Sequence, residues 1–141
     1  MIQASTALGI DLGFVLRLDA HVDRLAKLLE SGSAAVGGEV DRAQRYVAPT
    51  ILRNVSPESP VMQEEIFGPI LPILTVESVD EAIRFVNERE KPLALYVFTN
   101  RQEVEDAVLA RTSAGGVSVN TVIWHIGNVH LPFGGVGESG M

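Results

Sequence analysis

The stretch from Leu93 to Asn120 reads LALYVFTNRQEVEDAVLARTSAGGVSVN and alternates between two kinds of local pattern. Leu93–Thr99 is a continuous apolar run, which is typical of a buried strand. Asn100–Glu103 has the spacing of a capping box and predicts a helix start, and Ser-Ala-Gly-Gly at 113–116 ends that helix. Val117–Asn120 begins another strand. The expected inward face of the helix consists of Val104, Ala107, Val108 and Ala110.

The same alternation is present immediately upstream. Ile70–Val76 has the composition of a buried strand, despite Pro72. Ser78–Glu81 is a capping box that predicts a helix extending to about Arg89. Strands and helices that alternate with short connections indicate right-handed βαβ units, so we expect an α/β fold with a mostly parallel sheet and flanking helices. Ligands bind such sheets beyond the carboxyl ends of the strands, and 120–125 follows one such end.

The N-terminal half gives weaker signals. Asp19 is a good N-cap residue, and the apolar spacing after it predicts an amphipathic helix over Ala20–Ser31. Ala34–Val36 is consistent with a short strand or a turn. Tyr46–Val55 is rich in β-forming residues, and Pro49 places this run near a sheet edge or a bulge.

Between these halves lies a constrained turn, Met62–Pro69, with the sequence MQEEIFGP. Gly68 permits backbone angles that other residues avoid and Pro69 fixes the next φ, so the turn should present a carboxylate and an aromatic ring in a fixed relation. Such a pair suits a sugar hydroxyl beside a flat heterocycle. The alternative is a solvated acidic pair with Phe67 as an ordinary core residue.

Composition narrows the classes of function. The chain has 141 residues, the size of one domain, and a net charge of -7 with only 11 Lys and Arg residues, which argues against nucleic acid as a partner. It has no cysteine, which excludes disulfides, thiolate metal sites and thiol nucleophiles. The apolar segment Ala4–Leu16 is interrupted by Asp11 and lacks a basic leader, so we expect neither a membrane span nor a signal peptide, and a cytoplasmic location.

Neither a phosphate loop nor a metal site is evident. The segment Leu131–Met141 contains four glycines but no Lys followed by Ser or Thr, and no Gly-x-Gly-x-x-Gly motif opens a helix in the chain. The histidines, His21, His125 and His130, have no metal-ligand spacing, so no metal is expected. An alternative is an enzyme of another kind, built on His125 or His130 with Glu64 or Glu65 as its partner.

Five sequence blocks nevertheless occur in the order seen in aldehyde dehydrogenases, and they look most like the class 3 branch. The resemblance covers residues 18–141 and leaves 1–17 unmatched. Because the family normally begins well upstream and continues beyond this C-terminus, the resemblance implies the C-terminal part of a catalytic domain, truncated at both ends. The blocks are Arg45–Thr50, Met62–Pro69, Arg89–Tyr96, Gly115–Asn120 and Pro132–Gly140.

The resemblance implies oxidation of an aldehyde to a carboxylic acid with NAD or NADP as cofactor. Glu65 matches the glutamate that holds the nicotinamide ribose, and Phe67 matches the ring that packs against the nicotinamide. In such enzymes a thiolate attacks the aldehyde. A homodimer or heterodimer would be consistent with the family. The segments that line or support the aldehyde tunnel contain Asn120, Trp124, His125 and Phe133, of which Trp124 and His125 match by position only.

The departures from the family are equally informative. The family's catalytic cysteine, its activating glutamate and its adenosine-binding part lie upstream of the matching blocks, and this chain contains no cysteine. We therefore assign no catalytic residue and expect the chain to be inactive when isolated. The alternative is a binding or regulatory module that pairs with a full-length homologue.

Overall fold

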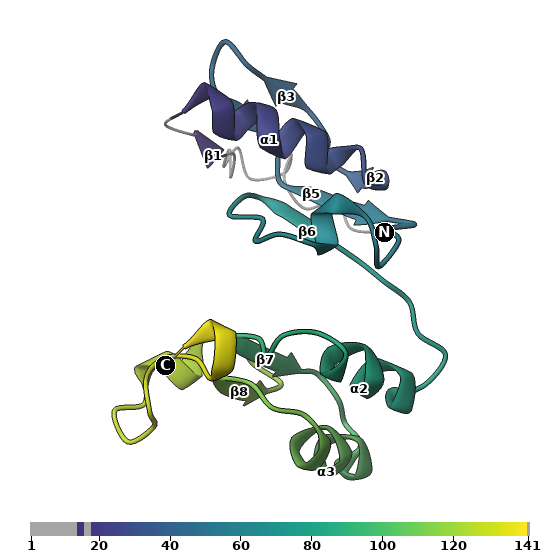
Figure 1. Ribbon diagram of the computed structural model, residues 1–141, viewed down its shortest axis with the longest axis vertical. Helices are drawn as coiled ribbons and strands as arrows, with labels where there is room; N and C mark the ends of the chain where they lie inside the picture. Colours follow the sequence, from purple (N-terminus) through teal and green to yellow (C-terminus); the bar gives the residue numbers. More distant parts are fainter. Residues whose placement is uncertain (1–13, 16–17, 141) are drawn as a thin grey trace. The chain divides into compact units, whose positions relative to one another are not determined.

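The computed structural model describes residues 14–15 and 18–140, the first two by their backbone alone (Figure 1). Most of the segment 1–17, which the sequence sets apart, therefore lies outside the described residues. The chain forms two compact units, Met1–Thr75 and Val76–Met141, and each is described by itself.

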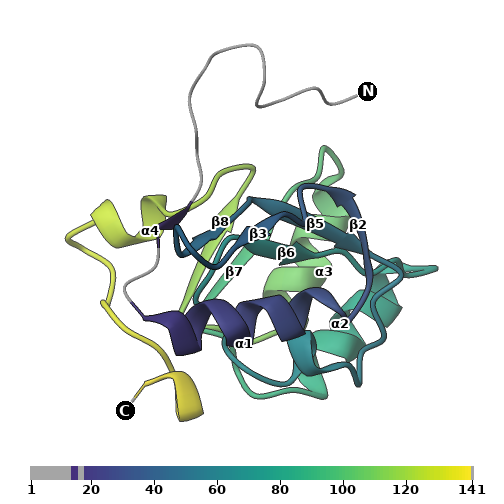
Figure 2. The same ribbon diagram turned by 90° about the horizontal axis from the view of Figure 1, so that it is seen from above.

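The first unit combines one helix with short strands. Helix α1 (Asp19–Leu29) runs alongside the strands (Figure 2). Strands β1 (Phe14–Val15), β4 (Tyr46–Val47) and β3 (Val40–Asp41) form an antiparallel sheet in that order. Strands β2 (Ser33–Val36), β5 (Thr50–Arg53) and β6 (Ile70–Pro72) form a second sheet, in which β5 pairs antiparallel with β2 and parallel with β6. The 3-10 helix η1 (Pro60–Met62) precedes β6.

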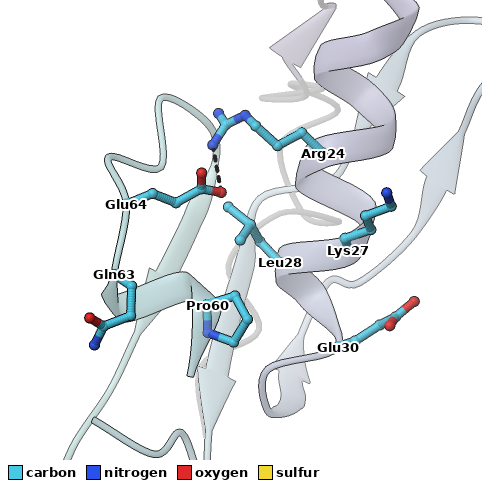
Figure 3. Close-up of a pocket in the computed structure, with 7 residues that line it drawn as sticks. All are labelled: Arg24, Lys27, Leu28, Glu30, Pro60, Gln63 and Glu64. Carbon is cyan, nitrogen blue, oxygen red and sulfur yellow. Dashed lines mark hydrogen bonds and ion pairs between the residues drawn. The ribbon is translucent and has the colours of Figure 1, made fainter. Parts of the chain in front are cut away.

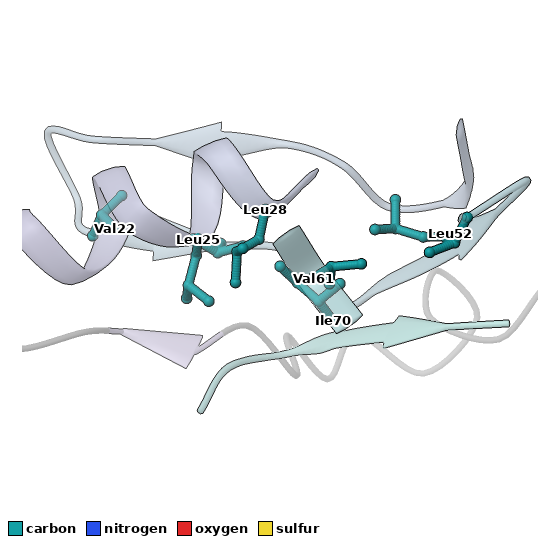
Figure 4. Close-up of a cluster of buried hydrophobic side chains, with 8 residues drawn as sticks. Val22, Leu25, Leu28, Leu52, Val61 and Ile70 are labelled. Atoms are coloured by element: carbon teal, nitrogen blue, oxygen red, sulfur yellow. The ribbon is translucent and has the colours of Figure 1, made fainter. Parts of the chain in front are cut away.

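A single hydrophobic cluster holds this unit together. One face of α1 packs onto β4, β5, η1 and β6 (Figure 4). Leu25 and Leu52 are fully buried, so each removes an entire side chain from water. The cluster contains Val22, Leu25, Leu28, Val47, Leu52, Val55, Val61 and Ile70.

The start of α1 differs from the sequence prediction. Leu18 is the N-cap and makes no side-chain cap, whereas Asp19 lies in the first turn. The Asp19 carboxylate instead accepts hydrogen bonds from Arg45 Nε at 2.6 Å and Nη2 at 3.3 Å. The hydrogen bond and the positive charge of Arg45 lower the pKa of Asp19. The prediction was wrong because a guanidinium 26 residues away competes for this carboxylate.

The second unit contains the predicted strand, helix and strand. Helix α2 (Val79–Asn87) comes first, followed by β7 (Ala94–Val97), α3 (Gln102–Arg111) and β8 (Gly116–Val119). Strands β7 and β8 are parallel, with Ala94 opposite Gly116 and Val97 opposite Val119. The short helices α4 (Trp124–Gly127) and η2 (Gly137–Ser139) follow. The α/β prediction is thus confirmed, with helix α3 connecting the parallel strands β7 and β8.

Several local predictions need correction. The strand expected over Ile70–Val76 ends at Pro72, and Leu71, Ile73 and Val76 are exposed rather than buried. Strand pairing stops there because its partner β5 ends at Arg53. Among the named strands of the described residues, β5–β6 and β7–β8 pair parallel, and the other three pairings are antiparallel.

The two predicted capping boxes have different outcomes. Ser78 caps α2, since its Oγ accepts the Glu81 N–H at 3.2 Å, while the Glu81 carboxylate accepts the N–H of Glu77. At α3 the N-cap is Arg101 rather than Asn100, and no side chain caps the helix. The predicted box at Asn100–Glu103 was therefore wrong.

Candidate functional site

The turn Met62–Pro69 is fixed to helix α1 by one arginine (Figure 3). Arg24 donates from Nη1 to the carboxylate of Glu64 at 3.1 Å and to the carbonyl of Glu65 at 3.2 Å. Its Nη2 donates to the carbonyl of Ile66 at 2.5 Å. One guanidinium thus holds two consecutive carbonyls and a carboxylate, which uses the rigid fork of donors that arginine provides.

His21 extends this arrangement by one residue. Its Nε2 lies 2.8 Å from the carbonyl oxygen of Phe67, and its Nδ1 lies 3.2 Å from Arg24 Nη2. A carbonyl only accepts and a guanidinium only donates, so both contacts are satisfied by a neutral imidazole with its proton on Nε2. At the next residue, a Cβ on Gly68 would lie 2.6 Å from a methyl carbon of the buried Leu25. The turn therefore lies directly against α1.

These anchors leave two side chains of the turn free for a ligand. Phe67 has a φ of +43°, a conformation that bulky residues rarely adopt, and its ring is 73% exposed. The core interpretation of Phe67 is therefore wrong. Glu65 is exposed, and its carboxylate has no hydrogen-bond or ion-pair partner among the described residues. The turn thus presents an exposed aromatic ring and an unpaired carboxylate on a backbone that α1 holds in place.

A shallow groove of about 680 Å³ adjoins the turn. It lies between α1 and η1, and the Arg24–Glu64 ion pair crosses one end of it (Figure 3). Neither Glu65 nor Phe67 lines it, and its walls carry charges of both signs. The lining residues are Arg24, Lys27, Leu28, Glu30, Pro60, Gln63 and Glu64.

The other predicted site residues belong to the second unit. Asn120 follows β8 with a φ of +54°. Its side-chain amide pairs with the backbone of Thr99, because Oδ1 accepts the Thr99 N–H and Nδ2 donates to the Thr99 carbonyl, both at 2.9 Å. Its own N–H donates to Val97 at 2.7 Å. Asn120 therefore joins the carboxyl ends of β7 and β8, and both ends of its amide are occupied.

Trp124, His125 and Phe133 follow in the segment after Asn120. Trp124 is 75% exposed and Phe133 is 85% exposed, so both rings are accessible from solvent. His125 is half-buried, and its ring lies against β8 next to the ring of Tyr96. The predicted residues thus comprise two outward aromatic rings and two side chains that contact the sheet. Among the described residues, no cluster of His, Asp and Glu could hold a metal ion.

Sequence reasoning missed Arg24 and His21. The available signal was their spacing of three residues on α1, which places both on the same helix face. Their partners lie 40 to 46 residues away in the chain, so the spacing could not identify what they bind.

Within the described part of the chain, no helix has the length and apolar character needed to cross a membrane.

Comparison with known proteins identifies the family. The model of the "Aldehyde dehydrogenase family" matches residues 16–141. The chain is 56% identical over 131 residues to the mouse "Aldehyde dehydrogenase, dimeric NADP-preferring" and 60% identical over 121 residues to mouse "Aldehyde dehydrogenase family 3 member A2". These alignments cover 93% and 86% of this chain but only 29% and 25% of the relatives' lengths.

Solved structures agree with this assignment. The substrate-bound state of Staphylococcus aureus AldH superposes with a TM-score of 0.83 at 48% identity, covering 88% of this chain and 28% of that one. The NAD-dependent aldehyde dehydrogenase of Sinorhizobium meliloti gives a TM-score of 0.79 at 32% identity, covering 90% and 26%. The chain belongs to the aldehyde dehydrogenase family, and it is similar to the family 3 members over about a quarter of their length.

Proposed function

We propose that this chain supplies the nicotinamide end of the cofactor site, and part of the aldehyde site, for an NAD(P)-dependent oxidation of an aldehyde to a carboxylic acid. The observation that carries this proposal is the turn at Met62–Pro69. Three consecutive carbonyls, those of 65–67, are held by Arg24 and His21, while the side chains of Glu65 and Phe67 stay exposed.

The roles follow from the chemistry of the two side chains. An ionised carboxylate only accepts hydrogen bonds, so Glu65 would hold the two hydroxyls of the nicotinamide ribose. Phe67 offers a flat apolar face to the nicotinamide ring and would fix the face that it presents to substrate. The bound dinucleotide would supply the hydride acceptor. One relative is described as NADP-preferring, and a solved neighbour as NAD-dependent, so we propose NAD or NADP as the cofactor.

The cofactor half of the proposal can be tested with nicotinamide mononucleotide, which carries only the nicotinamide, ribose and phosphate. Saturation-transfer NMR should show contact of the chain with the nicotinamide and ribose protons. Phe67→Ala should remove the ring contacts, and Glu65→Gln should weaken those of the ribose. Glu30→Gln, in the neighbouring groove, is the matched control and should behave as the parent. Equal signals in all four proteins would contradict the assignment.

We also propose that the 141-residue chain does not oxidise aldehydes by itself. It has no cysteine, so no thiolate is present to attack the aldehyde. Loss of the nucleophile from such a mechanism typically lowers the rate by several orders of magnitude, about 10⁴ to 10⁶. The measurement is NADH or NADPH absorbance during incubation with aromatic and medium-chain aldehydes. Steady turnover above background would disprove this proposal.

A second function, as a binding module for a full-length homologue, is favoured by the apolar surface of the chain. Large apolar side chains are exposed in both units, including Leu71 at 59% and Phe98 at 66%. Exposed apolar patches commonly mark surfaces that bind another protein. Co-purification of the chain with a purified family 3 aldehyde dehydrogenase would support this function. Separate elution of the two proteins by size-exclusion chromatography would exclude it.

A further inference from the structure

We propose that His125 is a positioning residue that fixes the conformation of the segment 121–127, which follows strand β8. The consequence for aldehyde binding rests on the proposed function, whereas the structural role stands on the contacts of the ring. His125 is the second residue of α4 and points back onto one face of the β7–β8 pair.

The imidazole packs against three residues on that face. Gly116 lies beneath the ring so closely that a Cβ would come within 2.3 Å of His125 Cδ2. Ser118 is buried, and its Oγ lies 3.4 Å from His125 Nδ1. Tyr96 is opposite Ser118 in the strand register, and its ring centroid lies 5.8 Å from that of the imidazole. Because residues two apart in a strand share a face, Gly116 and Ser118 lie side by side under the ring.

The segment held in this way is strained. Ile123 has a φ of +70°, which a β-branched residue rarely adopts. Such a conformation persists only where the surrounding contacts impose it. Before Ile123 in the chain, the Asn120 side chain is hydrogen-bonded to Thr99. After it, the His125 ring packs on β8. Two anchors therefore bracket the strained residue.

The helix that carries His125 is too short to be stable alone. α4 has four residues, which is about one turn, and isolated helices of that length do not form in water. Its neighbouring side chains add little, because Ile123 is 60% exposed, Trp124 75% and Ile126 53%. The imidazole is thus the main link between this turn and the sheet. It also fixes the positions of these three apolar side chains, which are exposed and could contact an apolar aldehyde.

The structural role can be tested by NMR on the ¹⁵N-labelled chain without any ligand. In the parent, the heteronuclear NOE of amides 121–127 should match that of β7, as expected for an ordered backbone. His125→Ala should lower the order parameters of this segment to about 0.6 or less, the range of flexible backbone, while β7 stays unchanged. His125→Phe keeps a flat ring over Gly116 and should restore most of the order. His130→Ala, at an exposed position three residues beyond this segment, is the control.

A double-mutant cycle separates positioning from a general loss of stability. Gly116→Ala introduces a methyl group where the ring lies, so it should loosen the segment in the parent. In the His125→Ala background the ring is gone, and the same substitution should have little further effect. Additive effects, or an ordered segment in His125→Ala, would overturn the proposal.

The link to the aldehyde is tested with benzaldehyde, observed at the indole N–H resonance of Trp124, the only tryptophan. If the segment is ordered only about a tenth of the time in the His125→Ala variant, the apparent affinity of this variant for benzaldehyde should fall about tenfold. Unchanged affinity in a disordered segment would overturn this link. If the parent itself does not bind benzaldehyde, the proposed aldehyde site fails, while the NOE measurements still decide the role of His125.

Discussion

At the scale of single residues, the candidate cofactor site depends on groups that do not belong to its motif. The backbone of the turn at 62–69 accepts hydrogen bonds from Arg24 and His21, and the side chains of Glu65 and Phe67 make no comparable contacts with the described residues. The motif was evident in the sequence as a rigid turn with a carboxylate and a ring. Its support was not evident, because hydrogen bonds from a helix 40 residues upstream leave no local pattern.

Removal of the Arg24 guanidinium should loosen this turn. Arg24→Met leaves the carbonyls of Glu65 and Ile66 without their donor, and we expect a loss of about 1–2 kcal/mol in stability because Arg24 is partly exposed. Amide exchange in the turn should accelerate, and binding of nicotinamide mononucleotide should weaken. Urea denaturation measures the loss of stability, and hydrogen exchange measures the loosening of the turn. Lys27→Met, one turn further along α1, is the control, and equal changes in both variants would contradict this role.

Gly68 should be the least replaceable residue of the turn. A Cβ at this position would lie 2.6 Å and 2.7 Å from the two methyl carbons of Leu25, which is fully buried and has no room to move. Overpacking of this kind typically costs about 1–3 kcal/mol. We expect Gly68→Ala to lower the urea midpoint accordingly. Gly127→Ala, where a Cβ meets nothing within 4 Å, should have no such effect, and similar losses would argue against close packing at Gly68.

At the scale of elements, helix α1 is held to the β3–β4 hairpin by two ion pairs. Arg45 pairs with Asp19 at 2.6 Å and Arg42 pairs with Asp23 at 2.8 Å. All four side chains are largely exposed, so these pairs add little stability individually and mainly fix the helix against the hairpin. Arg45 has a φ of +54° at the end of the hairpin turn, and its side chain reaches Asp19 at the start of α1.

The Asp19 pair should give a pH dependence of known sign. Arg45 lowers the pKa of Asp19 below the ordinary value of 3.8, first through its hydrogen bond and then through its charge. The carboxylate therefore contributes stability that is fully present above that value, and the contribution is lost as the pH falls through the lower pKa of the folded state. The Tm difference between the parent and Asp19→Asn should therefore shrink as the pH falls below 3.8 and disappear below the pKa of the folded state. A difference that grows with acidity would contradict the assignment.

How much of each element could be predicted depended on where its partners lie. The start of α2 was correct because Ser78 and Glu81 are near each other in the chain. The predicted start of α3 was wrong because Thr99 Oγ1 accepts the N–H of Arg101, and because the side-chain amide of Asn120 pairs with the backbone of Thr99 from 21 residues away, outside any local window. The strand after Ile70 was predicted too long because its end is set by β5.

At the scale of the whole chain, the family and the α/β fold could be predicted because five motifs occur in order. The candidate site could be predicted only in part. Glu65, Phe67, Trp124 and Phe133 lie on exposed positions, as a ligand-binding role requires. Asn120 and His125 instead contact the sheet, and only the strand register shows that Gly116, Ser118 and Tyr96 receive the imidazole. Motif matching identifies positions but does not distinguish a residue that contacts a ligand from one that positions its neighbours.

The distribution of buried residues predicts unequal stability in the two units. Among the described residues, nine of the ten buried apolar side chains belong to the first unit, and Ile83 is the one in the second. Since stability scales with buried apolar area, the second unit should unfold first. In a urea series followed by NMR, the amide resonances of β7 and β8 should disappear at lower urea than those of β5. Leu52→Ala should cost about 2–5 kcal/mol in the first unit and bring the two transitions closer together. A single transition shared by all three strands in the parent would show that the second unit draws its stability from the rest of the chain.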